Sequence, residues 1–219
     1  MQRIVFWFDV ISPYAWLAFE RLPQALEGCS YAVEYRPLLL AGVLQAWGQK
    51  GPAEIAPKRA WTYRQVAWLA HAQGTTLQLP RPHPFNPLAL QRLGLAAAPA
   101  GSTPNRRVVE LLFRHVWCRD GADPNEPAAL AALTAAVAPQ RDPAGDEVKA
   151  ELRGRTDAAV AQGVFGVPTF ECGGRRFWGH DALPMLRAAL LGDAWFDGPD
   201  WDAAARQPDG VRRRHQPRE

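Results

Sequence analysis

Cysteine is scarce in this sequence. Only three of the 219 residues are cysteines, and Cys29, Cys118 and Cys172 lie far apart along the chain. An odd number of cysteines with no CxxC pair and no metal-ligand spacing argues against a disulfide framework, a zinc site and a dithiol redox centre. It favours a reducing compartment. We expect all three cysteines to be buried and to behave as small apolar residues.

Long apolar segments are also missing. No stretch reaches the ~20 apolar residues that a membrane-spanning helix needs. The apolar run in the N-terminal sequence MQRIVFWFD is interrupted by Asp9 and is too short for the hydrophobic region of a signal peptide. We therefore expect a soluble, cytoplasmic protein with no membrane partner.

The charge of the chain is nearly balanced. Lys and Arg number 25 and Asp and Glu number 22, so the formal net charge is +3 at pH 7. The basic excess is concentrated near the end, at Arg212, Arg213, Arg214 and Arg218. Because neither interleaved aromatic residues nor a nucleic-acid-binding motif accompanies these arginines, we expect no nucleic-acid partner. Residues 208–219 are expected to form a solvated, disordered tail.

The stretch FWFDVISPYAWLA, residues 6–18, joins a short apolar strand to a helix. Ser12, followed by Pro13 and then by Trp16 and Leu17, predicts an N-cap, an N1 proline and the first apolar turn. Free backbone N–H groups and the positive end of the helix dipole then meet at Ser12, a place that suits an anion such as a thiolate. A simple helix cap without further function is the alternative interpretation.

A second informative stretch is GVFGVPTF, residues 163–170. Extended runs follow at 169–172 and 175–178, and the glycine pair between them predicts a β-hairpin. A proline just ahead of a strand is placed where a cis peptide bond could expose backbone groups. We therefore predict a cis Val167–Pro168 bond that faces Ser12.

Apolar periodicity and turn residues divide the remaining chain into strands and helices. Strands are expected at 3–8 and 32–37, with a helix at 13–27 between them that Pro23 kinks or ends early. Further helices are expected at 38–47, at 57–73, from Pro87, at 105–119, from Asp123 to about 137, at 146–162 and at 179–191. The helices predicted between the two β-containing parts of the chain indicate an inserted all-helical block.

This order of elements resembles a known family. It is similar to the thioredoxin-fold branch that contains 2-hydroxychromene-2-carboxylate isomerase, kappa-class glutathione transferase and DsbA-type oxidoreductases. The pattern FDVISPYAWLA resembles the start of the isomerases and kappa-class proteins, with Ser12 where the oxidoreductases have the first cysteine of CxxC. The resemblance covers residues 3–191. It implies an α/β class, thioredoxin-like fold with a large all-helical insertion.

The resemblance also suggests how the chain divides. A chain of this length can form one large or two small domains and can bury about 70% of its unfolded surface without disulfides. We expect a thioredoxin-like domain made of residues 1–37 and 163–191, with a returning helix from about 146. A helical insertion domain would occupy 38–145 and a tail 192–219. In that tail, Trp195, Phe196 and Trp201 are expected to pack back on the body.

The family further implies a set of site residues, with glutathione as the cofactor and no metal. Ser12 would be the catalytic residue, because its hydroxyl would donate to the sulfur of glutathione. The residues implied to bind glutathione are Ser12, Val167, Pro168, Trp178, Gly179, His180 and Asp181, the last four of which match a Trp-Gly-x-Asp segment. Substrate binding is implied for Gln49, Lys50 and Asn86.

The chain departs from the family pattern at two places. Gln49 stands where the family has an asparagine, and a longer amide could reach the same partner. The positions of a Tyr-x-x-x-Asp-x-x-Arg motif carry Trp61, Gln65 and Trp68. This change removes an internal ion pair and is expected to reshape the substrate pocket.

Two residues of the proline-rich loop LPRPHPFNP, residues 79–87, also have simpler interpretations. Asn86 precedes a helix and reads as its cap. His83 could titrate near neutral pH, but it reads as a surface residue.

The leading interpretation is a glutathione-dependent isomerase that interconverts a chromene carboxylate and its benzylidenepyruvate in aromatic catabolism, with a small aromatic substrate. A kappa-like glutathione transferase is the main alternative. The next alternatives are a DsbA-family protein without disulfide-exchange activity and a non-catalytic binding module. Thiol-disulfide exchange needs a cysteine nucleophile, which the segment Ser12-Pro13-Tyr14-Ala15 lacks. The sequence does not decide whether the chain forms a homodimer.

Overall fold

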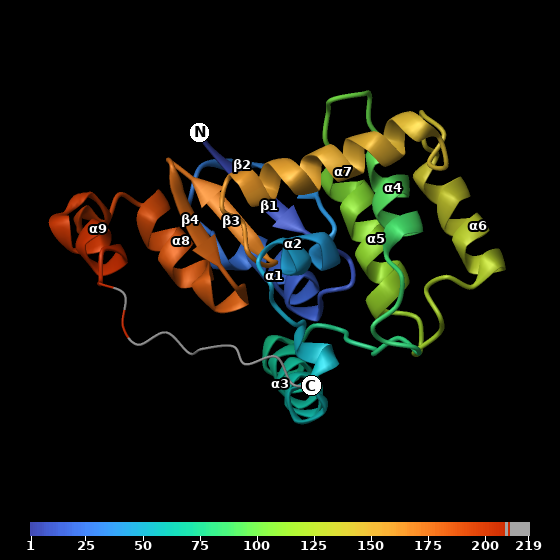
Figure 1. Ribbon diagram of the computed structural model, residues 1–219, viewed down its shortest axis with the longest axis horizontal. Helices are drawn as coiled ribbons and strands as arrows, with labels where there is room; N and C mark the ends of the chain where they lie inside the picture. Colours follow the sequence, from blue (N-terminus) through green and yellow to red (C-terminus); the bar gives the residue numbers. More distant parts are fainter. Residues whose placement is uncertain (209, 211–219) are drawn as a thin grey trace, which may run out of the picture.

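Four strands form one mixed sheet at the centre of the computed structural model, which describes residues 1–208 and 210 (Figure 1). β1 (Gln2–Phe8) runs parallel to β2 (Tyr31–Pro37). β3 (Thr169–Cys172) pairs antiparallel with β1 and with β4 (Arg175–Trp178). The order across the sheet is β2-β1-β3-β4. The predicted strands are confirmed, and both N-terminal strands begin one residue earlier than expected.

Helix α1 (Pro13–Ala25) connects the two parallel strands. Its apolar residues Trp16, Phe19 and Leu22 recur at helical spacing and are buried. Pro23, which has no N–H to donate to the helix, lies inside the last turn, and the helix ends at Ala25 rather than at residue 27.

A block of helices follows β2 and returns the chain to the sheet. Its elements are α2 (Leu40–Ala46), the 3-10 turn η1 (Pro52–Glu54), α3 (Ala56–Gln73), α4 (Leu88–Ala96), α5 (Arg106–Trp117), α6 (Pro127–Val137) and α7 (Asp146–Ala161). In Figure 1, α4, α5 and α6 gather on one side of the sheet, α7 runs from them back along it, and α3 stands apart. The predicted α/β, thioredoxin-like fold with a large helical insertion is observed.

Helix α6 begins later than predicted. The Glu126 side chain accepts hydrogen bonds from the N–H groups of Ala128 and Ala129 and so caps the helix at Pro127. Asp123 instead accepts from the N–H of Asn125 at 2.8 Å. The expected start at Asp123 is therefore wrong, because its carboxylate closes a local turn.

The sheet and the helical block share one hydrophobic core. The ring of Phe113 on α5 lies 5.4 Å from that of Phe8 on β1 and 5.3 Å from that of Phe19 on α1. These residues belong to one buried cluster that also holds Trp16 and Trp117. The division of the chain into two domains and a tail stays a prediction.

The closing part of the chain contains the 3-10 turn η2 (His180–Ala182), α8 (Leu183–Leu190), η3 (Ala194–Asp197) and α9 (Pro199–Ala205). The predicted single helix at 179–191 is thus wrong at its start, since the α-helical part begins at Leu183. The rings of Phe196 and Trp201 lie 5.9 Å and 6.0 Å from that of Phe177, so the predicted packing against the body is confirmed for them. The predicted disorder of 208–219, with its four arginines, falls mostly outside the described residues.

The cysteine prediction holds for one residue of three. Cys172 is buried, whereas Cys29 and Cys118 are only half-buried. Within residues 1–208 and 210, no helix combines the length and the apolar character needed to cross a bilayer.

Candidate active site at the start of helix α1

Ser12 is the N-cap of α1, as the sequence predicts. Its backbone is extended (φ −88°, ψ 115°), and its Oγ accepts a hydrogen bond of 3.3 Å from the N–H of Ala15. Its carbonyl oxygen accepts from the same N–H and from that of Trp16. Only 6% of Ser12 is exposed. Because Oγ acts as the acceptor toward the helix, its hydrogen can be donated to a ligand.

Asp9 organises the loop that leads into Ser12, and the sequence interpretation gave it no such role. It is fully buried. Its two carboxylate oxygens accept from the N–H of Ile11 at 3.1 Å and from that of Leu40 at 2.8 Å. Burial raises the pKa of Asp9 to about 7, and the two N–H groups act in the opposite direction. The sequence signal for this role of Asp9 is an acidic residue placed between an apolar strand and a helix cap.

His83 lies beside this loop rather than on the surface, which corrects the prediction. Its Nε2 is 2.9 Å from the Ile11 carbonyl oxygen, and its Nδ1 is 2.8 Å from the Tyr63 hydroxyl. Burial lowers the pKa of His83. Both ring nitrogens are engaged by these partners, so His83 is not arranged as a general base for Ser12.

The Val167–Pro168 peptide bond is cis, as predicted. Thr169, the next residue, pairs with Trp7 near the end of β1. Since α1 begins just after β1, the Val-Pro step and Ser12 lie at the same end of the sheet. The Pro168 carbonyl oxygen accepts a 2.9 Å hydrogen bond from the N–H of Gly179. This bond ties two of the predicted glutathione-binding segments together.

Trp178 projects from the end of β4 toward solvent. It is 54% exposed, and its ring lies 4.9 Å from that of Phe165. Gly179 has φ 103°, and a Cβ there would collide with the Asp181 carboxylate, so this position requires glycine. His180 and Asp181 belong to η2, which precedes α8. The predicted helix N-terminus at this segment is therefore a 3-10 turn.

Helix α3, although it stands apart from the sheet, contacts the same region through two side chains. The Tyr14 hydroxyl donates a 2.7 Å hydrogen bond to Gln65, and the Gln73 amide contacts the His180 ring. Burial raises the pKa of Tyr14, a hydrogen bond with Thr62 opposes this, and the Asp181 carboxylate adds to it. The start of α1, one side of α3 and η2 thus meet.

The three residues at the altered motif positions lie along one face of α3, because they are spaced by four and then three residues. Gln65 reaches Tyr14, whereas Trp61 and Trp68 are 62% and 64% exposed. Gln65 is thus the one of the three with a side-chain hydrogen bond to α1 among the described residues, and the expected change in the substrate pocket stays a prediction.

The predicted substrate-binding residues are less closely gathered. Gln49 and Lys50 are exposed in the loop after α2. The indole of Trp47 donates to the Val164 carbonyl oxygen at 2.9 Å, so this loop begins beside the segment that leads to Val167. Asn86 is exposed, and its Oδ1 accepts from the N–H of Leu88 at 3.0 Å. This contact agrees with the cap interpretation.

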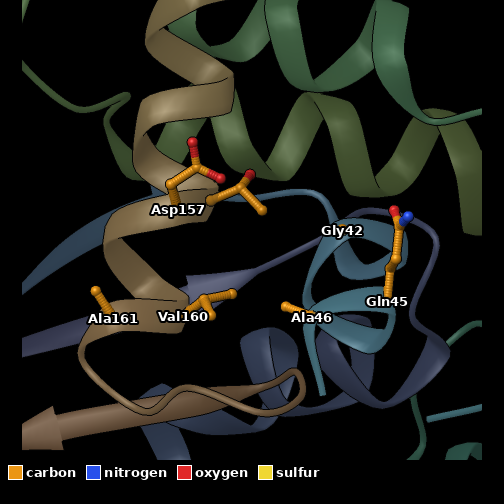
Figure 2. A pocket seen from close by; sticks show the side chains of 7 residues that line it. Gly42, Gln45, Ala46, Asp157, Val160 and Ala161 are labelled. Carbon is orange, nitrogen blue, oxygen red and sulfur yellow. The ribbon is translucent and has the colours of Figure 1, made fainter. Parts of the chain in front are cut away.

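A separate hollow of about 400 Å³ lies between α2 and α7 (Figure 2). Its lining consists of Gly42, Gln45, Ala46, Thr156, Asp157, Val160 and Ala161. None of the predicted site residues belongs to this lining. The candidate site is therefore defined by the convergence of segments around Ser12 and not by this hollow.

The chain is similar in sequence to two named kinds of enzyme. A glutathione S-transferase kappa 1 from Homo sapiens is 28% identical over 216 residues, covering 90% of this chain and 94% of its own. A 2-hydroxychromene-2-carboxylate isomerase from Pseudomonas putida is 27% identical over 191 residues, covering 84% and 92%.

Solved structures give the same fold. One of a 2-hydroxychromene-2-carboxylate isomerase matches with a TM-score of 0.74 and 23% identity, covering 91% of this chain and 98% of that one. The family model of the DSBA-like thioredoxin domain matches residues 3–191. The chain therefore belongs to the family of DSBA-like thioredoxin domains.

Proposed function

We propose that the protein is a cytoplasmic, glutathione-dependent isomerase of the 2-hydroxychromene-2-carboxylate isomerase type. The observation that carries the proposal is the placement of Ser12, a hydroxyl and not a thiol, at the N-terminus of α1, at the same end of the sheet as the cis Val167–Pro168 step. The named relatives, isomerases and kappa-class transferases at 26–28% identity, support an enzyme of this kind.

Ser12 and the helix N-terminus would stabilise the glutathione thiolate. A helix N-terminus contributes about 0.3 to 2 kcal/mol to a nearby negative charge, and lowering a thiol pKa by one unit takes about 1.4 kcal/mol. The hydrogen of the Ser12 hydroxyl supplies a further donor, because its oxygen is already occupied by the N–H of Ala15. Several such donors together would keep the sulfur ionised near neutral pH.

The rest of the tripeptide would extend along the tied segments. The main chain of Val167, ahead of Pro168, would pair with the cysteinyl part. Trp178, Gly179, His180 and Asp181 would surround the γ-glutamyl end, where the Asp181 carboxylate suits the ammonium group. The 2.9 Å bond between Gly179 and Pro168 supports one continuous binding surface.

The isomerisation would regenerate the thiolate of glutathione and so would consume no glutathione. The thiolate adds to the conjugated double bond of the open keto acid, which leaves a single bond and an enolate. Rotation about that bond and elimination of the thiolate restore the alkene in its other geometry. Gln49, Lys50 and Asn86 would hold the substrate, and the Lys50 ammonium suits its carboxylate.

Substitution of Ser12 tests this proposal. We expect Ser12→Ala to lose isomerase turnover while glutathione affinity stays within about tenfold, since one donor among several is removed. Loss of the cap costs about 0.5 to 2 kcal/mol of stability, so Ser12→Thr, which keeps both cap and hydroxyl, separates folding from chemistry. Ser102→Ala, at an exposed serine, is the matched control. Unchanged turnover in Ser12→Ala would remove Ser12 from the mechanism.

A kappa-like glutathione transferase is the second candidate, because the kappa 1 enzyme from Homo sapiens is as similar as the isomerases. Transfer would use the same thiolate without the elimination step. Release of a glutathione conjugate from an electrophile supports transfer, whereas interconversion of chromene carboxylate and benzylidenepyruvate without loss of glutathione supports isomerisation.

A third candidate is a DsbA-family protein without disulfide exchange, a role consistent with the family match. Glutathione binding without turnover on either substrate class would favour it. We propose a small aromatic molecule as the substrate and a homodimer as the assembly. Neither a nucleic acid nor a membrane is proposed as a partner. Light scattering at several concentrations would test the homodimer.

A further inference from the structure

The two peptide carbonyls just ahead of Ser12 are held by side chains from distant parts of the chain. The Trp117 indole at the end of α5 donates to the Val10 carbonyl oxygen at 3.0 Å. The His83 ring lies with Nε2 2.9 Å from the Ile11 carbonyl oxygen. The rings of His83 and Trp117 also pack against each other, with centroids 5.5 Å apart. Side chains from distant parts of the chain therefore fix the backbone that leads into α1.

The protonation of the His83 ring follows from its partners. A carbonyl oxygen only accepts hydrogen bonds, so Nε2 must carry the hydrogen that reaches Ile11. In the neutral ring, Nδ1 is then the acceptor for the Tyr63 hydroxyl, 2.8 Å away on α3. The same hydroxyl lies 3.0 Å from the His83 carbonyl oxygen. Together these contacts fix the orientation of the His83 ring.

We propose that His83 is a positioning residue that holds residue 12 at the positive end of α1 through the hydrogen bond from its Nε2–H to the Ile11 carbonyl. Ser12 caps α1 only while its backbone is extended and its Oγ lies 3.3 Å from the Ala15 nitrogen. Without the His83 donor, the Ile11 carbonyl would rotate toward water or another donor. The peptide that joins Ile11 to Ser12 would turn with it.

This role goes beyond the proposed function and does not depend on glutathione. It concerns the electrostatic environment of position 12, which a thiol placed there would report directly. Thiols at helix N-termini have a pKa of about 3.5 to 7.5, compared with about 8.5 for a free cysteine. A Ser12→Cys variant therefore measures how well residue 12 is held at the helix end.

The experiment uses the full chain with Ser12→Cys and measures the alkylation rate of that thiol by iodoacetamide across pH. Mass spectrometry of the peptides separates its signal from those of Cys29, Cys118 and Cys172. His83→Gln and His83→Asn are then added in turn. The amide of glutamine can reach the place of Nε2 and donate to Ile11, whereas the shorter amide of asparagine reaches only the place of Nδ1, near Tyr63.

We expect a lowered thiol pKa in Ser12→Cys that is kept with His83→Gln and rises by about one unit or more with His83→Asn, toward the free value. Tyr63→Phe, which leaves the bond to Ile11 in place, is the control and should leave the thiol pKa within about half a unit, as a change outside the direct contact would. A residue with only a structural role would lower the unfolding temperature without moving this pKa.

Three results would overturn the proposal. They are an ordinary thiol pKa in Ser12→Cys itself, an unchanged pKa in folded His83→Asn, and an equal rise in the Gln and Asn variants. If His83→Asn does not fold, His83→Gln decides, because a raised pKa there contradicts the role of the donor. Failure of the wild-type protein to bind glutathione would affect the proposed function and leave this measurement intact.

Discussion

The hydroxyl of Tyr14 donates a hydrogen bond of 2.7 Å to Oε1 of Gln65, and so joins the first turn of α1 to the middle of α3. This link matters because α3 fully buries only Val66 and Ala70 along its 18 residues. With so little apolar contact, polar bonds make an unusually large contribution to holding α3 over the start of α1.

The Tyr14–Gln65 bond should have a measurable energy. Tyr14→Phe removes the hydroxyl and keeps the ring, and we expect the free energy of unfolding to fall by about 0.5 to 1.5 kcal/mol. Urea denaturation gives this value. In a double-mutant cycle with Gln65→Ala, a coupling of about 0.5 kcal/mol or more is expected. Tyr31→Phe is the control at another half-buried tyrosine, and losses equal to the control with no coupling would contradict the role of this bond.

Asp9 should make stability depend on pH. Its folded pKa of about 7 exceeds the ordinary 3.8, so the folded state binds the proton more tightly. The resulting stabilisation is fully present below pH 4 and is lost as the pH rises from about 4 to 7. Its size is on the order of 4 kcal/mol. Asp9→Asn, which cannot titrate, should flatten this decline.

The test compares unfolding free energies of wild type and Asp9→Asn between pH 4 and 8. The variant should be the less stable protein at low pH, because its amide nitrogen, which is a donor, must face the N–H group of either Ile11 or Leu40. The difference should narrow as the pH rises. Asp202→Asn at an exposed helix position should keep the wild-type slope, and parallel curves for wild type and Asp9→Asn would show that Asp9 does not titrate in this range.

Gly166 should tolerate no side chain while Trp178 holds its place. A Cβ at Gly166 would lie 2.6 Å from the Trp178 Nε1, closer than packing allows. We expect Gly166→Ala to lower the free energy of unfolding by about 1 to 3 kcal/mol and to weaken glutathione binding by displacing the indole. Both can be read by urea denaturation and calorimetry.

Two variants sharpen the Gly166 prediction. Gly154→Ala, in α7 with open space around the new Cβ, should be stabilising by up to about 1 kcal/mol. Adding Trp178→Ala to Gly166→Ala removes the clash and should recover part of the stability. If the double variant is as unstable as the sum of the single changes, the indole is not the obstacle.

Local patterns in the sequence determined much of the framework. Ser12 followed by Pro13 marks the start of α1, and the Gly173-Gly174 pair marks the hairpin, because caps and tight turns are set by residues close in sequence. The alternating pattern of residues 32–37 likewise predicts β2 without distant information. Such signals also suffice for the family resemblance.

Tertiary structure decided the environment of the polar residues. His83 reads as a surface residue in its proline-rich loop, yet Tyr63, Trp117 and the Ile11 carbonyl enclose it. Asp9 reads as the end of an apolar run, yet Leu40 supplies one of its hydrogen bonds. Burial and hydrogen bonding of a side chain depend on elements far away in sequence, and only the folded chain brings these together.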